Sequence, residues 1–160
     1  MKHLPKHFRQ RWRYIAVGIE TDPDTYIRRK DLQRELWYSA GNLLGDPGSA
    51  DVDLTVYSCR FEDGVGEAVI RTRREETDRA RAAIACVSRV SGTAVGIHVR
   101  GISGTVRACE ERSLGRAAGI SEENDVAFAN GRHPAYRRDG LVEIQLPSGF
   151  VGATELDIEY

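Results

Sequence analysis

The order of hydrophobic periodicities between residues 14 and 116 is the feature that most constrains the fold of this chain. Apolar residues alternate with polar ones, as on strands, in four stretches: 14–20, 53–61, 67–73 and 95–102. They recur at helical spacing in three others: 31–44, 75–90 and 105–116. The Asp-Gly pair at 63–64 predicts a hairpin turn between the second and third strands. The element order is therefore strand–helix–strand–strand–helix–strand, followed by a further helix.

This order is that of a ferredoxin-like, or RRM-like, βαββαβ fold. Each strand–helix–strand unit is long enough for a right-handed crossover, and two such units combine into one four-stranded antiparallel sheet. We expect an α+β domain with helices packed on one face of that sheet, followed by an added C-terminal helix and an extension. The first helix is expected to end at Gly45–Gly48, because glycine and proline break helices.

The last third of the chain differs in charge from the rest. Residues 1–116 carry 20 Lys and Arg against 16 Asp and Glu, whereas residues 117–160 carry 3 against 8. The stretch 117–140 has the composition of a linker, and the alternation at 141–146 predicts a hairpin with 150–158. Disorder is the competing interpretation of this segment. We therefore expect a domain of residues 1–116 and an acidic C-terminal extension of residues 117–160.

Residues 1–13 form a basic arm with five Lys and Arg residues and no acid. Phe8 and Trp12 lie among these cations, a pattern typical of segments that neutralise phosphates and stack on bases. The alternative is a flexible terminus whose aromatic residues pack on the domain.

The segment from Gly101 to Glu110 connects the fourth strand to the last helix. Ser103 or Thr105 is suited to cap that helix, and Arg107 follows in its first turn. Such a helix start can hold a phosphate without a catalytic side chain. By contrast, the third strand has no aromatic residue, so base stacking as on RRM sheets is not expected. If Ile97 and Val99 face the helices, His98 and Arg100 face outward with Tyr14 and Tyr57.

The sequence shows no constellation for catalysis or for a metal. The three cysteines are far apart and form no Cys-x-x-Cys pair, which indicates a reducing compartment. His3 and His7 have helical spacing but no third ligand nearby, and no nucleophile has an adjacent base in a recognisable motif. The N-terminus lacks a signal-peptide pattern and the apolar runs are too short to cross a bilayer. We expect a cytoplasmic protein without catalytic residues, a bound metal or a cofactor.

Four segments resemble the protein component 2 family of archaeal ribonuclease P. They are 11–15, 41–48, 66–71 and 99–110, of which the last, Val-Arg-Gly-Ile-Ser-Gly-Thr-Val-Arg-Ala-Cys-Glu, is the most specific. The resemblance covers residues 1–116, and the Arg-rich, Lys-poor composition resembles the halophilic branch of the family.

The resemblance implies a non-catalytic subunit of ribonuclease P, which removes the 5′ leader of precursor tRNA. It implies that the RNA subunit cuts with bound magnesium, and that the protein's partners are ribonuclease P RNA, precursor tRNA, the component 3 protein and a second copy of itself. By position, it implies a set of RNA-facing residues: Arg11, Arg13, Arg71, Ser103, Gly104, Thr105 and Arg107.

Two other functions stay open at this point. One is a protein–protein adaptor that never meets RNA. The other is a small ferredoxin-like acyl-phosphate hydrolase, which needs an anion-binding loop after the first strand; residues 21–25 of this chain are acidic and poorly suited to phosphate.

Overall fold

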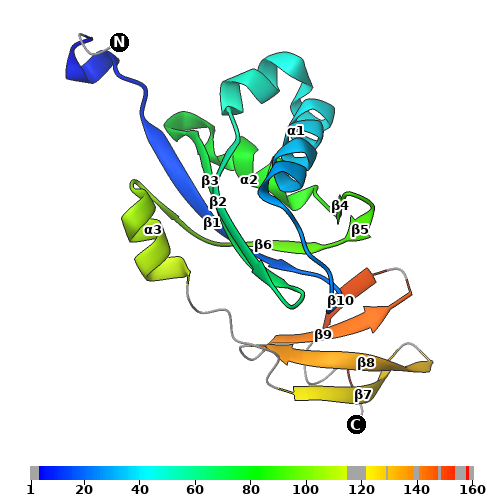
Figure 1. The fold of residues 1–160 in the computed structure, drawn as a ribbon. Helices are drawn as coiled ribbons and strands as arrows, with labels where there is room; N and C mark the ends of the chain where they lie inside the picture. Colours follow the sequence, from blue (N-terminus) through cyan, green and yellow to red (C-terminus); the bar gives the residue numbers. More distant parts are fainter. Residues whose placement is uncertain are drawn as a thin grey trace.

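Strands β1 (Trp12–Glu20), β2 (Thr55–Glu62), β3 (Val65–Arg73) and β6 (Gly96–Ser103) form one antiparallel sheet in the order β2-β3-β1-β6 (Figure 1). This computed structural model describes residues 4–114, 122–128, 130–138, 141–147, 149–153 and 158. The order confirms the predicted βαββαβ arrangement, in which the first and third strands are central. A short 3-10 helix, η1 (Lys6–Phe8), precedes β1.

The helices lie on both faces of this sheet. Helices α1 (Arg29–Val52) and α2 (Thr77–Ala85) cover the main core, to which β1 contributes Ile15, Val17 and Ile19. Helix α3 (Val106–Ser113) covers the other face, where Cys109 is fully buried with Ala16 and Val69. The prediction that the helices share one face therefore holds for α1 and α2, whereas α3 packs on the opposite side.

The first helix breaks at Gly45 (φ 71°, ψ 171°), as predicted, but a second helical segment follows it and continues α1 to Val52. Pro47 lies in the first turn of that segment, where its missing N–H is tolerated. The predicted end of the second helix is wrong. The helix expected over 75–90 begins with a 3-10 turn, η2 (Arg74–Glu76), and ends at Ala85. The following residues form a small hairpin of β4 (Arg89–Val90) and β5 (Thr93–Ala94).

The extension contains a second antiparallel sheet, in the order β10-β9-β8-β7. Its strands are β7 (Glu122–Phe128), β8 (Gly131–Arg138), β9 (Leu141–Leu146) and β10 (Gly149–Ala153). Strands β9 and β10 form the expected hairpin. The interpretation of 117–140 as a linker is wrong for 122–138, because single apolar residues among the charges, Val126 and Ala135, suffice to join a small core.

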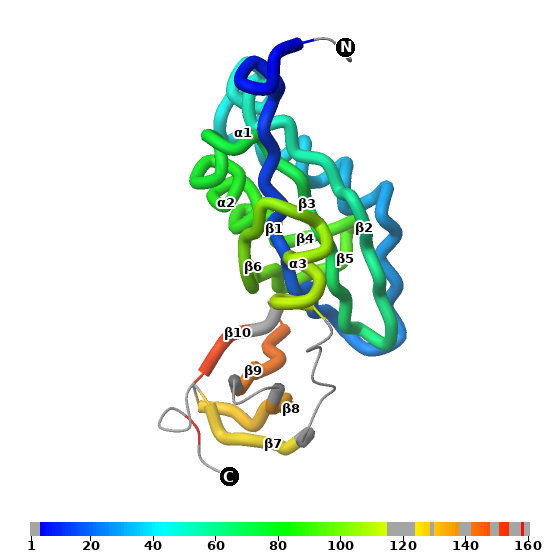
Figure 2. Tube along the Cα trace, turned by 90° about the vertical axis from the view of Figure 1, so that its left-hand side faces the viewer, coloured from blue at the N-terminus to red at the C-terminus, as the bar shows by residue number. Residues whose placement is uncertain are grey.

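The second sheet lies at the end of the molecule opposite to the N-terminal arm (Figures 1 and 2). Gln145 of β9 donates a hydrogen bond to Asp22 Oδ1 at 2.6 Å, beside the loop after β1. At about 3.3 Å per residue, the nine residues of β1 separate that loop from the arm by about 30 Å. This distance is several screening lengths at physiological ionic strength, so the acidic extension does not shield the basic arm. In the part of the chain described, no helix is long and apolar enough to cross a membrane.

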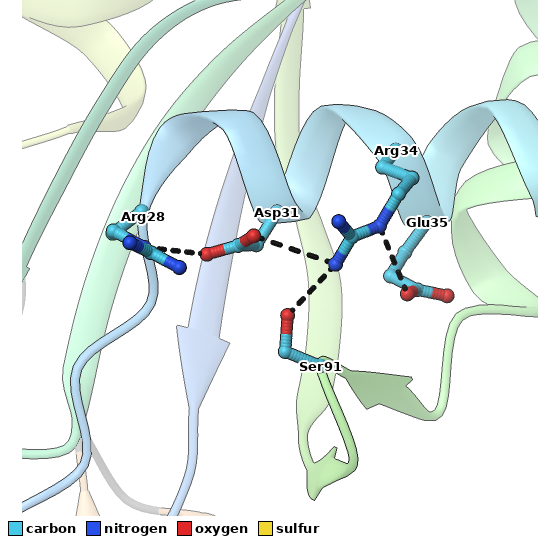
Figure 3. Close-up of polar contacts among 5 residues, drawn as sticks. All are labelled: Arg28, Asp31, Arg34, Glu35 and Ser91. Atoms are coloured by element: carbon cyan, nitrogen blue, oxygen red, sulfur yellow. Dashed lines mark hydrogen bonds and ion pairs between the residues drawn. The ribbon is translucent and has the colours of Figure 1, made fainter.

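The start of α1 is held by a buried carboxylate (Figure 3). Asp31 accepts hydrogen bonds from Arg28 Nε at 2.7 Å and from Arg34 Nη2 at 3.4 Å. Arg34 also donates to Ser91 Oγ at 3.1 Å, which ties the helix to the turn between β4 and β5. The hydrogen bond from Arg28 holds the pKa of the Asp31 carboxyl below its ordinary value, although burial opposes this shift.

We expect Asp31→Asn to lower stability at neutral pH and to matter progressively less in acid. Because the folded pKa is depressed, the carboxylate contributes stability that is fully present above the unfolded pKa near 3.8 and is lost as the pH falls through the lower folded value. Urea unfolding at pH 7 and at pH 3 measures this difference. Asp46→Asn, an exposed position in the same helix, is the control. A difference that persists unchanged at pH 3 would contradict the prediction.

Candidate RNA interface

One end of the first sheet collects most of the residues that the sequence singled out. Here β1 begins while β3 and β6 end, because both strands run antiparallel to β1. Tyr14 of β1 pairs with Arg71 of β3 on one side and with Ser103 of β6 on the other. Directly paired residues point to the same face, so Arg71 and Ser103 flank Tyr14 on the face that carries α3.

Four side chains at this end form what we call the aromatic–arginine patch: Trp12, Tyr14, Tyr57 and Arg71. The Arg71 guanidinium carbon lies 4.0 Å from the centre of the Trp12 ring, a cation–π contact. The rings of Tyr14 and Tyr57 meet edge to face with centroids 6.0 Å apart. The patch therefore joins β1, β2 and β3 in a row across the sheet.

A β-bulge places Tyr57 in the patch. Val56 pairs with Ile70 and Ser58 with Val69, so Tyr57 is the extra residue of β2. Bulges bend a strand, re-aim side chains and often lie next to functional sites. Tyr57 is 54% exposed although it is a large aromatic residue on a strand.

Arg71 of the patch and its neighbour Arg73 have unused hydrogen-bonding capacity. Arg71 Nη2 reaches Thr55 Oγ1 only at 3.5 Å, and the neighbouring Arg73 pairs loosely with Asp53 at 3.8 Å. The Nε atoms of both arginines are buried and have no hydrogen-bond partner among the described residues. An acceptor from a ligand, such as a phosphate oxygen, would satisfy them.

The two arginines before the patch differ in their surroundings. Arg13 is half-buried, and its Nη1 atom lies 3.4 Å from the position that a Cβ atom on Gly104 would occupy. These two predicted residues are therefore adjacent. Arg11 is exposed, and its carbonyl accepts the Arg74 backbone N–H at 3.0 Å. Across the described ranges, Arg11, Arg13 and Arg71 take part in no ion pair, which leaves their charges available to a polyanion.

The segment before α3 has a structural role that its sequence only partly indicated. Thr105, not Ser103, caps the helix: its Oγ1 accepts the Ala108 N–H at 3.2 Å. Arg107 is highly exposed and pairs with Glu111 at 2.7 Å. The glycine at 101 is required by packing, because a Cβ there would collide with Ser113 at the end of α3. The structure thus brings Ser103 and Gly104 beside Tyr14 and Arg13, whereas the charge of Arg107 is paired within α3.

The other end of the same face is neutralised internally. Ile97 and Val99 pack against the main core, so His98 and Arg100 face outward as expected. Arg100 forms a largely buried ion pair with Glu67 at 2.6 Å. Desolvation lowers the pKa of His98, while Glu20 opposes this, and the shift favours the uncharged imidazole. This end offers no free cation from these groups.

The loop expected for a hydrolase lies at this neutral end. Asp22 and Asp24 are exposed there, and Asp22 accepts the hydrogen bond from Gln145. Carboxylates repel an anionic substrate and no arginine of the patch reaches this loop, so the geometry disfavours phosphate chemistry after β1.

Sequence reasoning missed Arg73 as an interface residue, and it placed Tyr57 on the outward face with Tyr14 without the bulge that brings it into the patch. The signal was present in β2, where the core-facing residues Val56, Cys59 and Phe61 are spaced by three and then two. A spacing of three breaks the strand period and indicates a bulge between Val56 and Cys59. The third strand indeed lacks aromatic residues, but the aromatic rings on this face come from β1 and β2.

Comparison with known proteins places the chain in a family. The model of the Rpp14/Pop5 family matches residues 13–114, from the second residue of β1 to the residue after α3. A "Ribonuclease P protein component 2" from Halorubrum lacusprofundi is 57% identical over 159 residues, 99% of this chain and 100% of that protein. The relative of the same name from Natronomonas pharaonis is 56% identical over 158 residues, 99% of this chain and 98% of that protein.

A more distant relative matches a smaller share of the chain. The "Ribonuclease P protein component 2" from Methanosarcina mazei is 33% identical over 114 residues, 71% of this chain and 93% of that protein. The family model itself spans the strands and helices of the domain that carries the aromatic–arginine patch, and the chain belongs to the Rpp14/Pop5 family.

Proposed function

We propose that this chain is the component 2 subunit of ribonuclease P and helps the RNA subunit to remove the 5′ leader of precursor tRNA. The observation that carries the proposal is the similarity, over nearly the full length of both chains, to proteins named ribonuclease P protein component 2. The structure supports it with arginines that converge at one end of the sheet, of which Arg13 and Arg71 have no acidic partner among the residues described.

In this role the protein screens charge rather than breaking bonds. Arg13 and Arg71 neutralise phosphates that repel one another where RNA helices pack, and each contact releases counterions. Magnesium, where bound, would be held by the RNA subunit and would supply the Lewis-acid chemistry there, and we assign no residue of this chain to it. The partners in this proposal are ribonuclease P RNA, precursor tRNA, the component 3 protein and a second copy of this chain, all in the cytoplasm.

Reconstitution with cognate RNA and component 3 tests this function. We expect omission of this chain to slow precursor-tRNA cleavage at limiting magnesium, and added magnesium to restore part of the rate, because both cations relieve the same phosphate repulsion. A purified chain without RNA should not cleave precursor tRNA. Cleavage that is unchanged on omission of the chain at every magnesium concentration would refute the proposal.

A further inference from the structure

We infer that the aromatic–arginine patch binds an unpaired RNA nucleotide, with its base stacked on Tyr57 and its phosphate held by Arg71. The inference rests on the proposed function and specifies it: the patch recognises single-stranded RNA rather than the backbone of a duplex.

The first argument is the exposure and fixed position of Tyr57. The residue is 54% exposed, yet the bulge in β2 sets its backbone and the edge contact with Tyr14 limits the rotation of its ring. A ring held in place before binding loses little conformational entropy when a base stacks on it. Stacking on an aromatic side chain contributes roughly 1–3 kcal/mol per base and tolerates any base, because every base has a π-face.

The second argument is the charge beside that ring. Arg71 lies in the row next to Tyr14, stacks on Trp12 and has a buried Nε without an acceptor among the residues described. Trp12 orients the guanidinium without neutralising it, since a cation–π contact brings no opposite charge. No member of the patch is acidic. An aromatic face beside an unpaired guanidinium matches a nucleotide, which presents a flat base and an anionic phosphate on one unit.

The third argument excludes a duplex as the ligand of Tyr57. In an A-form helix the base faces are covered by their neighbours, and the edges lie in grooves that a side chain fixed on a sheet does not enter easily. Only a nucleotide in a loop, a bulge or a single strand exposes its base face. Stacking at Tyr57 therefore selects unpaired RNA, whereas the surrounding arginines bind either form.

Fluorescence anisotropy with a labelled short oligoadenylate, and with an RNA duplex of the same length, tests the inference on the full chain. We expect Tyr57→Ala to weaken oligoadenylate binding by about 10-fold or more and duplex binding by less than about 2-fold. Tyr57→Phe should bind as the wild type does, because stacking needs the ring and not the hydroxyl. The salt dependence should stay the same in all three proteins, since stacking releases no counterions.

Tyr26→Ala is the matched control. Tyr26 is also an exposed tyrosine, 71% exposed, and it also meets an aromatic partner edge to face, Phe61 at 6.2 Å. It lies in the loop after β1, away from the patch, so its loss should leave both affinities unchanged.

Two results would overturn the inference. Equal affinities of Tyr57→Ala and wild type for oligoadenylate would show that no base stacks there, and equal losses on the single strand and the duplex would show that the patch does not select unpaired RNA. Either result, obtained with a wild-type chain that stimulates the reconstituted enzyme, leaves the proposed function intact. If wild-type protein fails to stimulate cleavage, it is the proposed function that fails.

The patch could instead bind an apolar side chain of component 3. In that case Tyr57→Ala would lose binding to component 3 while its RNA affinity stays unchanged, and the inference would be overturned.

Discussion

The double replacement of Arg13 and Arg71 by alanine should weaken binding of ribonuclease P RNA by about 10-fold or more and flatten its salt dependence. Each phosphate that the protein neutralises adds roughly 0.7–0.9 to the slope of log affinity against log salt, so removing two arginines reduces the slope by about 1.4–1.8. Neither arginine pairs with an acid among the described residues, so their removal leaves no buried carboxylate uncompensated. Filter binding across a range of salt concentrations, with component 3 present, measures both quantities.

Two controls separate charge at the interface from charge in general. Arg81→Ala with Arg89→Ala removes the same net charge from exposed positions on α2 and β4, and it should leave the slope nearly unchanged. Arg71→Lys should keep the slope and still lose affinity, because an ammonium lacks the planar fork that stacks on Trp12. A slope unaffected by the double replacement would mean that RNA does not contact these arginines.

The core of the first domain could be predicted because its signals are local. Alternation places Ile15, Val17 and Ile19 on one face of β1, and these residues are fully buried beneath α1 and α2. The Asp-Gly pair sets the β2–β3 hairpin by the backbone angles that its residues adopt, φ 49° at Asp63 and 75° at Gly64. Periodicity and turn chemistry depend on neighbouring residues alone, so a single sequence contains them.

The parts that could not be predicted depend on interactions between distant segments. The second helix ends at Ala85 and the chain turns into the β4–β5 hairpin, where Ser91 accepts a hydrogen bond from the distant Arg34 of α1. In the extension, Val126 and Ala135 are single buried residues, which do not form an alternating pattern that predicts a strand. They become part of a core only because they pack with Val142 and Ile144 of β9. Such pairings appear in a sequence only as isolated apolar residues.

The candidate interface was predictable in many of its residues and not in how they are arranged. Arg71 and Ser103 were identified by position, and the register then placed them on either side of Tyr14. Tyr57 joins them through a bulge that shifts β2 by one residue relative to β3. A strict period of two hides this arrangement, because a one-residue shift moves every later side chain to the other face.

Replacing Cys109 by aspartate should detach α3 from the sheet without unfolding the domain. Cys109 is fully buried against Ala16 and Val69, and burial raises the pKa of its thiol, so the residue acts as a neutral apolar group. A carboxylate there costs several kcal/mol to bury. The eight residues of α3 avoid that cost by leaving the sheet, since the main core lies on the other face.

Hydrogen exchange distinguishes this local opening from global unfolding. In Cys109→Asp, amides of Val106–Ser113 should exchange at least about 100-fold faster, which is about 3 kcal/mol of reduced protection, while amides of β1 and β3 stay protected. Cys86→Asp places the same charge on an exposed cysteine and should leave α3 protected. Loss of protection throughout the first sheet in Cys109→Asp would instead mean that the small core under α3 is needed for the whole domain, and that the two faces of the sheet fold as one unit.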